Sequence, residues 1–184
     1  MALELTDWLD RVSAPDWLWY AKRLAANDTK ASGGHQAGRH ISKTFLFRVF
    51  PLINTTDRKN PDILFRLNVA SHADSRDVRA IYYNNKFFEN PRSGRNEARI
   101  TGFGGSASAL LDAESTGAIA ILSFETGDDG AATECHVWVC RHETEEDIVE
   151  DRVGPVEPGK AVIWPPAQLL LPTVPSSRSS CYLH

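Results

Sequence analysis

The sequence has no long apolar run, and this limits what the chain can be. Its longest uninterrupted hydrophobic stretches, such as 118–122 and 169–171, hold five residues or fewer. A membrane-spanning helix needs about 18, so no membrane partner is predicted. The first ten residues carry Glu4, Asp7 and Asp10, whereas a secretory signal begins with basic residues before an apolar stretch. We therefore expect no export.

Cysteine is also scarce. The chain has 3 cysteines in 184 residues, Cys135, Cys140 and Cys181. The count is odd, and a chain of this length can bury a sizeable core without disulfide bonds. Reduced thiols and a cytoplasmic location are therefore predicted.

The stretch around the first two cysteines is a weak candidate metal site. On a strand, His136, Cys140 and His142 would share one face and Cys135 would face the other way. At ~3.3 Å per residue, the two histidines would lie about 20 Å apart. Because a tetrahedral site cannot span that distance, we expect structural roles and no bound metal.

Catalytic motifs are largely missing. Ser106 has no nucleophile elbow, the glycines of 102–105 lack the dinucleotide fingerprint, and there is no phosphate-binding loop. Asp62 with Glu97-Ala98-Arg99 faintly resembles a metal-dependent nuclease, but Arg99 stands where a lysine would assist the attacking water. No catalytic residue and no cofactor are predicted, and a nuclease using Asp62 and Glu97 stays open as an alternative.

Charge is distributed unevenly along the chain. The net charge is −4, yet residues 22–48 hold six basic side chains and one acid, and residues 76–99 hold six and three. Residues 125–151 hold ten acids and one base. Screening over roughly 8 to 10 Å means that a partner feels the nearby lobe more than the total. A basic surface for phosphate is therefore possible, and the acidic helix expected at 143–152 offers the alternative of a protein-interaction module.

Short strands dominate the hydrophobic pattern. Strands are predicted over 16–24, 63–70, 78–84, 98–103, 117–125, 134–141 and 161–164, and helices over 3–13, 42–50 and 143–152. The order shows no strand–helix alternation. We predict a mainly β fold with accessory short helices, arranged as a nearly closed β-barrel. The tail from Pro172 is rich in proline and serine and is expected to be loose.

Two polar loops interrupt this pattern and form candidate arms. The first covers 25–38, and the second covers 85–97. With the residues up to position 40, the first arm offers Lys30, His35, Gln36, Arg39 and His40. The second arm and the residues just after it offer Arg92, Arg95, Asn96, Glu97 and Arg99.

The second arm suits the reading of base edges. Arginine matches the O6 and N7 atoms of guanine, and glutamate accepts from the N4 amino group of cytosine. A purely nonspecific phosphate grip would avoid a carboxylate. The alternative is an exposed loop in which arginine and glutamate form an ion pair worth at most ~1 kcal/mol.

Several segments resemble the N-terminal effector-binding domain of EcoRII-type restriction endonucleases. The similarity covers about residues 8–165 and is carried by 20–29, 32–38, 79–84, 94–101, 116–118, 137–140 and 145–147. It implies a DNA-binding pseudobarrel, a fold shared with a plant transcription-factor domain, with two arms in the major groove. It also implies recognition of 5′-CC(A/T)GG in double-stranded DNA.

The resemblance further implies how the chain is organised. Residues 1–171 would form the noncatalytic DNA-binding domain, which would act as an effector or targeting domain. Residues 172–184 would form a flexible tail or linker toward a C-terminal nuclease domain, which alone would need Mg²⁺.

The family's DNA-contacting positions carry over residue by residue. The matching positions are Lys22, Arg23, His35, Arg95, Asn96, Glu97 and Arg99. His40 stands where the family has tyrosine and Ala98 where it has lysine. Ser93 lies near a further family lysine, whose role Arg92 would assume. The family and the groove chemistry agree on Arg95, Glu97 and Arg99.

Overall fold

The computed structural model describes residues 4–29, 38–103 and 108–166. Its strands are β1 (Trp17–Arg23), β2 (Gly38–His40), β3 (Asp62–Val69), β4 (Asp74–Tyr83), β5 (Glu97–Thr101), β6 (Ile119–Thr126), β7 (Ala132–Val139) and β8 (Ala161–Trp164). Its helices are α1 (Leu5–Arg11), α2 (Lys43–Val49) and α3 (Glu143–Val153). Short 3-10 turns cover Pro51–Ile53, Ala70–His72, Asn85–Phe87 and Ala113–Ser115. None of the helices in these ranges is both long and apolar enough to cross a membrane.

The expected elements are confirmed, with shifts at their ends. Each predicted strand and helix is present, and β8 has the predicted bounds. Ser42 caps α2, as the sequence indicates, by accepting a hydrogen bond from the backbone N–H of Phe45 at 3.4 Å. β4 begins four residues earlier than predicted because its residues 74–81 pair with β3 along the whole of that strand. The short strand β2 was not predicted.

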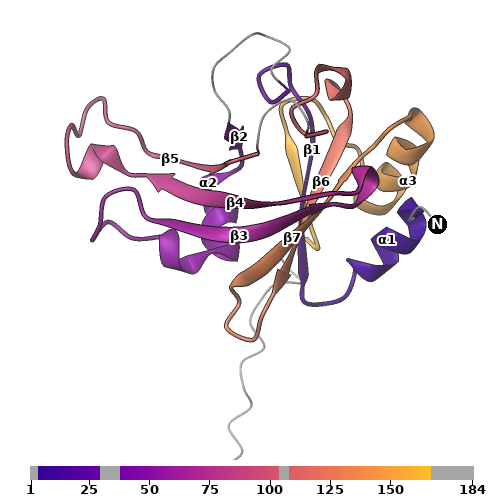
Figure 1. Ribbon diagram of the computed structural model, residues 1–184. Coiled ribbons are helices and arrows are strands. Elements are labelled where there is room, and N and C mark those ends of the chain that lie inside the picture. Colours follow the sequence, from indigo (N-terminus) through magenta and orange to yellow (C-terminus); the bar gives the residue numbers. More distant parts are fainter. Residues whose placement is uncertain (1–3, 30–37, 104–107, 167–184) are drawn as a thin grey trace, which may run out of the picture.

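The strands form a single curled sheet (Figure 1). Their order is β2-β5-β4-β3-β7-β6-β1-β8, and all neighbours are antiparallel except β3 and β7. The edge strands β2 and β8 are not neighbours in this order, so over the described residues the barrel is open. The mainly β fold class with accessory helices is confirmed.

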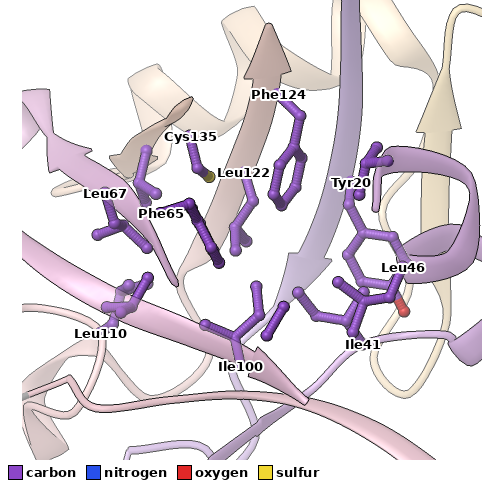
Figure 2. Packing of buried hydrophobic residues seen from close by; sticks show 14 of the residues in the cluster. Tyr20, Ile41, Leu46, Phe65, Leu67, Ile100, Leu110, Leu122, Phe124 and Cys135 are labelled. Carbon is purple, nitrogen blue, oxygen red and sulfur yellow. The ribbon is translucent and has the colours of Figure 1, made fainter. Parts of the chain in front are cut away.

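The inner face of the sheet holds the larger core. Alternate residues of six strands point into it, among them Tyr20, Phe65, Ile100 and Phe124 (Figure 2). Helix α2 contributes Phe45, Leu46 and Val49 to the same cluster. The helix therefore packs against the concave side of the open barrel, which buries the apolar face that the curled sheet would otherwise expose.

A second core lies on the outer face of β1, β6 and β7. Trp8 of α1 packs against Trp19 and Trp138, with ring centroids 6.4 and 5.6 Å apart respectively. Val149 of α3 joins this cluster. Helices α1 and α3 lie at one end of the molecule, away from the β4–β5 connection (Figure 1). This part of the sheet is thus buried on both faces.

The outer face of β3, β4 and β5 is different because none of the described helices joins a core there. On β3, Phe65 and Leu67 belong to the inner core, whereas Leu64 between them is 71% exposed. On β4, Val78 and Ala80 are buried in the inner core and Arg79 between them is exposed. Period-two alternation therefore leaves Leu64 and charged side chains such as Arg79 on this open face.

The cysteines at 135 and 140 lie in different cores. Cys135 belongs to the inner cluster and Cys140 to the outer one. His136 instead pairs with Glu134, with 2.9 Å between Nε2 and the carboxylate oxygen. The prediction that Cys135 faces away from its even-numbered neighbours is confirmed. Among the described residues no group of three histidine, cysteine or acidic side chains could hold a metal ion.

Candidate nucleic-acid interface

The candidate base readers lie on β5, next to the end of β4. Ala98 and Ile100 of β5 point into the inner core, so Glu97 and Arg99 point to the open outer face. The antiparallel register places Tyr83 opposite Glu97 and Ile81 opposite Arg99. Glu97 and Arg99, which the sequence predicts to act together, therefore lie on the same face of the sheet near the end of β4.

Glu97 and Arg99 form an ion pair along this face. The guanidinium Nη2 of Arg99 lies 3.0 and 3.1 Å from the two carboxylate oxygens of Glu97. The Nε atom of Arg99 is buried without a partner among the described residues. The ion pair that the alternative interpretation predicts is thus present. It also orients both side chains, and the carboxylate oxygens keep further lone pairs for a second donor.

Arg95 extends the same face. It is exposed, and its guanidinium lies over the ring of Tyr83, 5.1 Å from the ring centroid. A guanidinium that lies over an aromatic ring is restricted in orientation, so the arginine side chain loses less conformational freedom when it binds a partner. Arg95, Glu97 and Arg99 therefore share one side of the chain, as odd-numbered positions in an extended segment should.

Two side chains of this face were not among the predicted site residues. Arg79 is opposite Thr101 on β5 and pairs weakly with Asp62, at 3.7 Å. Tyr83 supports Arg95. Positions 79, 81 and 83 follow one another at i, i+2 spacing, so they share a face of β4. Once β4 and β5 are known to pair, this spacing would indicate that Arg79 and Tyr83 lie on the same face as Glu97 and Arg99.

Asn96 points to the opposite side, toward α2. Its side-chain oxygen Oδ1 accepts a hydrogen bond from the hydroxyl of Tyr82 at 2.7 Å and one from Nζ of Lys43 at 3.0 Å. Burial raises the pKa of Tyr82, so the hydroxyl stays protonated at neutral pH. Sequence reasoning grouped Asn96 with its neighbours, and strand alternation separates it from them.

The second arm makes a tight turn before β5. The backbone N–H of Gly94 donates to the carbonyl of Asn90 at 2.7 Å, and that of Lys86 donates to the carbonyl of Arg95 at 3.3 Å. Arg92 is exposed within this turn. A Cβ atom at Gly94 would lie 2.4 Å from backbone atoms of Lys86, so the two sides of the arm approach too closely for any other residue.

The first arm is described only at its ends. Lys30, His35 and Gln36 lie outside the described residues. The backbone of Arg39 and His40 forms β2, in which His40 is the register partner of Arg99 and Arg39 that of Ile100. The end of the first arm is therefore held beside Arg99 and Ile100 of β5.

The two basic residues at the end of β1 have acidic partners. Nζ of Lys22 lies 2.7 Å from the carboxylate of Asp28. Arg23 points to the outer side, where it pairs with Glu146 at 2.5 Å and Glu150 at 3.3 Å on α3. It also donates to the carbonyl oxygens of Val156 at 2.8 Å and Gly117 at 3.1 Å. The structure thus places Arg23 among α3 contacts, apart from the β5 residues.

The carboxylates of the nuclease alternative are separated. Asp62 begins β3 and Glu97 begins β5, so β4 lies between them and their Cα atoms are about 10 Å apart or more. Asp62 faces Arg79, and Glu97 is paired with Arg99. Two carboxylates that share a metal ion must converge on it, and these do not.

Comparisons with known proteins show the family of this chain. The family described as "Restriction endonuclease EcoRII, N-terminal" matches residues 13–168. The chain belongs to this family. It is 37% identical to the type II restriction enzyme EcoRII of Escherichia coli over 166 residues, which are 89% of this chain and 40% of that enzyme. The chain thus spans less than half of the length of that relative.

This EcoRII N-terminal domain also has a solved structural relative. The B3 domain of the UbaLAI restriction endonuclease, crystallised as a triple mutant with its cognate DNA, superposes with a TM-score of 0.55. The match covers 88% of this chain and 98% of that one at 17% sequence identity. At that identity the similarity shows the fold, and the open barrel described above is a pseudobarrel of the B3 type.

Proposed function

We propose that this EcoRII N-terminal domain binds double-stranded DNA in the major groove. The observation that carries the proposal is that Arg95, Glu97 and Arg99 lie together on the open outer face of the sheet. Two guanidinium groups and a carboxylate together match the donors and acceptors of G·C base pairs. The DNA complex of the UbaLAI B3 domain gives the same fold a DNA partner.

The finer proposal is that the domain recognises 5′-CC(A/T)GG as the effector or targeting domain of a type II restriction endonuclease. The family resemblance supports this sequence, and the G·C content of the site suits the arginine–glutamate pair. The first arm would add Lys30, His35, Gln36, Arg39 and His40, and the second Arg92 and Asn96. The family resemblance adds Lys22. This lysine is ion-paired with Asp28, and on binding it would exchange that carboxylate for a DNA phosphate.

We also propose that the domain does not cleave DNA. Asp62 and Glu97 are each paired with an arginine on separate strands. A C-terminal nuclease domain in the full-length enzyme would supply cleavage and its Mg²⁺. Incubation of this chain with plasmid and Mg²⁺ should leave the plasmid intact, and cutting that disappears in Glu97→Gln would restore the nuclease alternative.

Gel-shift titration tests the DNA-binding proposal. Arg95→Ala and Glu97→Ala should weaken binding to the cognate duplex by about 1–3 kcal/mol each and reduce discrimination at one base pair. Arg66→Ala is the matched control, because Arg66 is an exposed, ion-paired arginine on the outer face of β3 outside the predicted set. Equal weakening on cognate and single-substitution duplexes would show that Arg95 and Glu97 touch only phosphate.

A further inference from the structure

The side-chain amide of Asn96 is held in one orientation. Its Oδ1 lies 2.7 Å from the Tyr82 hydroxyl and 3.0 Å from Nζ of Lys43. A lysine ammonium carries donors only, so the amide atom beside it must be the oxygen. The opposite orientation would bring the NH₂ group against an ammonium. The nitrogen Nδ2 is therefore the group that points away, and it has no partner among the described residues.

The two groups that hold this amide are themselves fixed. Tyr82 is buried, and its ring packs edge-on against Phe47 of α2 with centroids 4.9 Å apart. Lys43 is the first residue of α2, directly after the Ser42 cap, and its Nζ lies 5.8 Å from the centroid of the Tyr82 ring. Helix α2 and strand β4 thus present two donors at a set place beside the start of β5.

We propose that Lys43 and Tyr82 are positioning residues that make Asn96 a donor-only contact to DNA. The inference rests on the proposed function and adds the chemistry of one contact. With Oδ1 occupied, Asn96 cannot make the paired hydrogen bonds to adenine N6 and N7 for which asparagine is known, because that pairing needs the amide oxygen as acceptor. Its NH₂ group donates to an acceptor, which is a phosphate oxygen or an acceptor on a base edge.

The two sides of the β5 segment would also have different roles in DNA binding. Glu97 and Arg99 lie on the outer face, and Asn96 lies on the side of α2. One extended segment therefore addresses DNA from both of its sides, with the outer side reading bases and the α2 side donating from a fixed amide.

A double-mutant cycle tests the positioning role. Asn96→Ala, Tyr82→Phe and the double variant are titrated against the cognate duplex. Tyr82→Phe should weaken binding about three- to tenfold, as expected for one lost hydrogen bond. In the Asn96→Ala background the same change should have no effect, because the hydroxyl acts only through the amide. Additive effects would overturn the inference.

Matched controls separate positioning from folding. Thr126→Val removes a hydroxyl of β6 that donates to the carbonyl of Asp16, and three strands separate β6 from β5, so this variant should bind as wild type does. Asn96→Asp replaces the outward donor by an acceptor, so it should bind more weakly than Asn96→Ala. Tighter binding of Asn96→Asp than of Asn96→Ala would overturn the donor assignment.

Modified duplexes identify the acceptor. One set carries single methylphosphonates, and the other carries single base analogues that lack one major-groove acceptor, which is N7 of a purine, O6 of guanine or O4 of thymine. Wild type should lose affinity at one modified position at which Asn96→Ala shows no further loss. A loss in the first set assigns a phosphate and one in the second assigns a base edge, whereas no such position in either set overturns the inference. Failure of wild type to bind any duplex would instead defeat the proposed function itself.

Discussion

The guanidinium of Arg23 lies 2.5 Å from the carboxylate of Glu146, although the two residues are 123 positions apart in the chain. The contact joins the end of β1 to α3. Hydrogen bonds from Arg23 to the carbonyls of Val156 and Gly117 bring in two further segments. The carboxylate of Glu146 raises the pKa of Arg23 through their hydrogen bond, which keeps the guanidinium charged. Arg23 thus connects several parts of the fold, and it is also a position at which the family resemblance predicts a DNA contact.

Arg23→Ala should lower the free energy of unfolding by about 1.5–3 kcal/mol, because it leaves Glu146 and two carbonyl groups without their charged donor. Urea denaturation measures the change. Arg92→Ala is the control, since Arg92 is exposed and no side-chain partner is described for it. Unchanged stability with weakened duplex binding would show that Arg23 serves DNA rather than the fold.

Gly94→Ala should disable the second arm while the cores stay folded. The added Cβ would lie 2.4 Å from the backbone of Lys86, so the turn before Arg95 must open. Duplex affinity should fall about tenfold or more, the cost of one displaced bidentate contact. Gly127→Ala serves as the control, because its Cβ would lie no closer than 3.4 Å to a side-chain oxygen and 3.8 Å to a backbone oxygen. Wild-type affinity of Gly94→Ala would mean that the arm's turn does not position the readers.

Glu145→Gln should make stability less dependent on acid pH. Burial by itself would raise the pKa of Glu145, but hydrogen bonds from Arg141 and Trp138 outweigh it and lower that pKa. A lowered carboxyl pKa contributes stability above the ordinary value of about 4.3 and loses it as the pH falls through the native value.

The stability gap between wild type and Glu145→Gln should therefore be full at pH 7 and shrink toward pH 3. Denaturant titrations across this range measure it, and the exposed Glu143→Gln on the same helix is the control. A gap that stays constant with pH would contradict the assignment.

The thiols of Cys135 and Cys140 should be inert in the folded protein. Burial raises the pKa of Cys135 well above its usual range and raises that of Cys140 to about 12. The thiolate is the reactive form. In a Cys181→Ser variant, an aromatic disulfide reagent at pH 8 should titrate no thiol in the native state and both after unfolding. Rapid reaction of the native variant would mean that one of the cores opens readily.

Local signals determined much of this fold. Short runs of apolar and aromatic residues were enough to predict β1, β6 and β7, and Ser42 with Pro51 was enough to predict α2, because these patterns report on neighbours in the chain. The three-residue strand β2 carries too few residues for such a pattern. It exists because β5 offers its edge to it.

The candidate site divides in the same way. The residue types of 95–99 were enough to predict a G·C-reading segment, since donors and acceptors belong to side chains whatever the fold. The pairing of β4 with β5 decides which of these residues share a face and places Tyr83 beside Arg95. The packing of α2 brings Lys43 to Asn96, which Tyr82 also holds. The packing of α3 decides that Arg23 turns toward that helix. Contacts between residues far apart in the chain leave no periodic trace in it, so only the tertiary structure decides them.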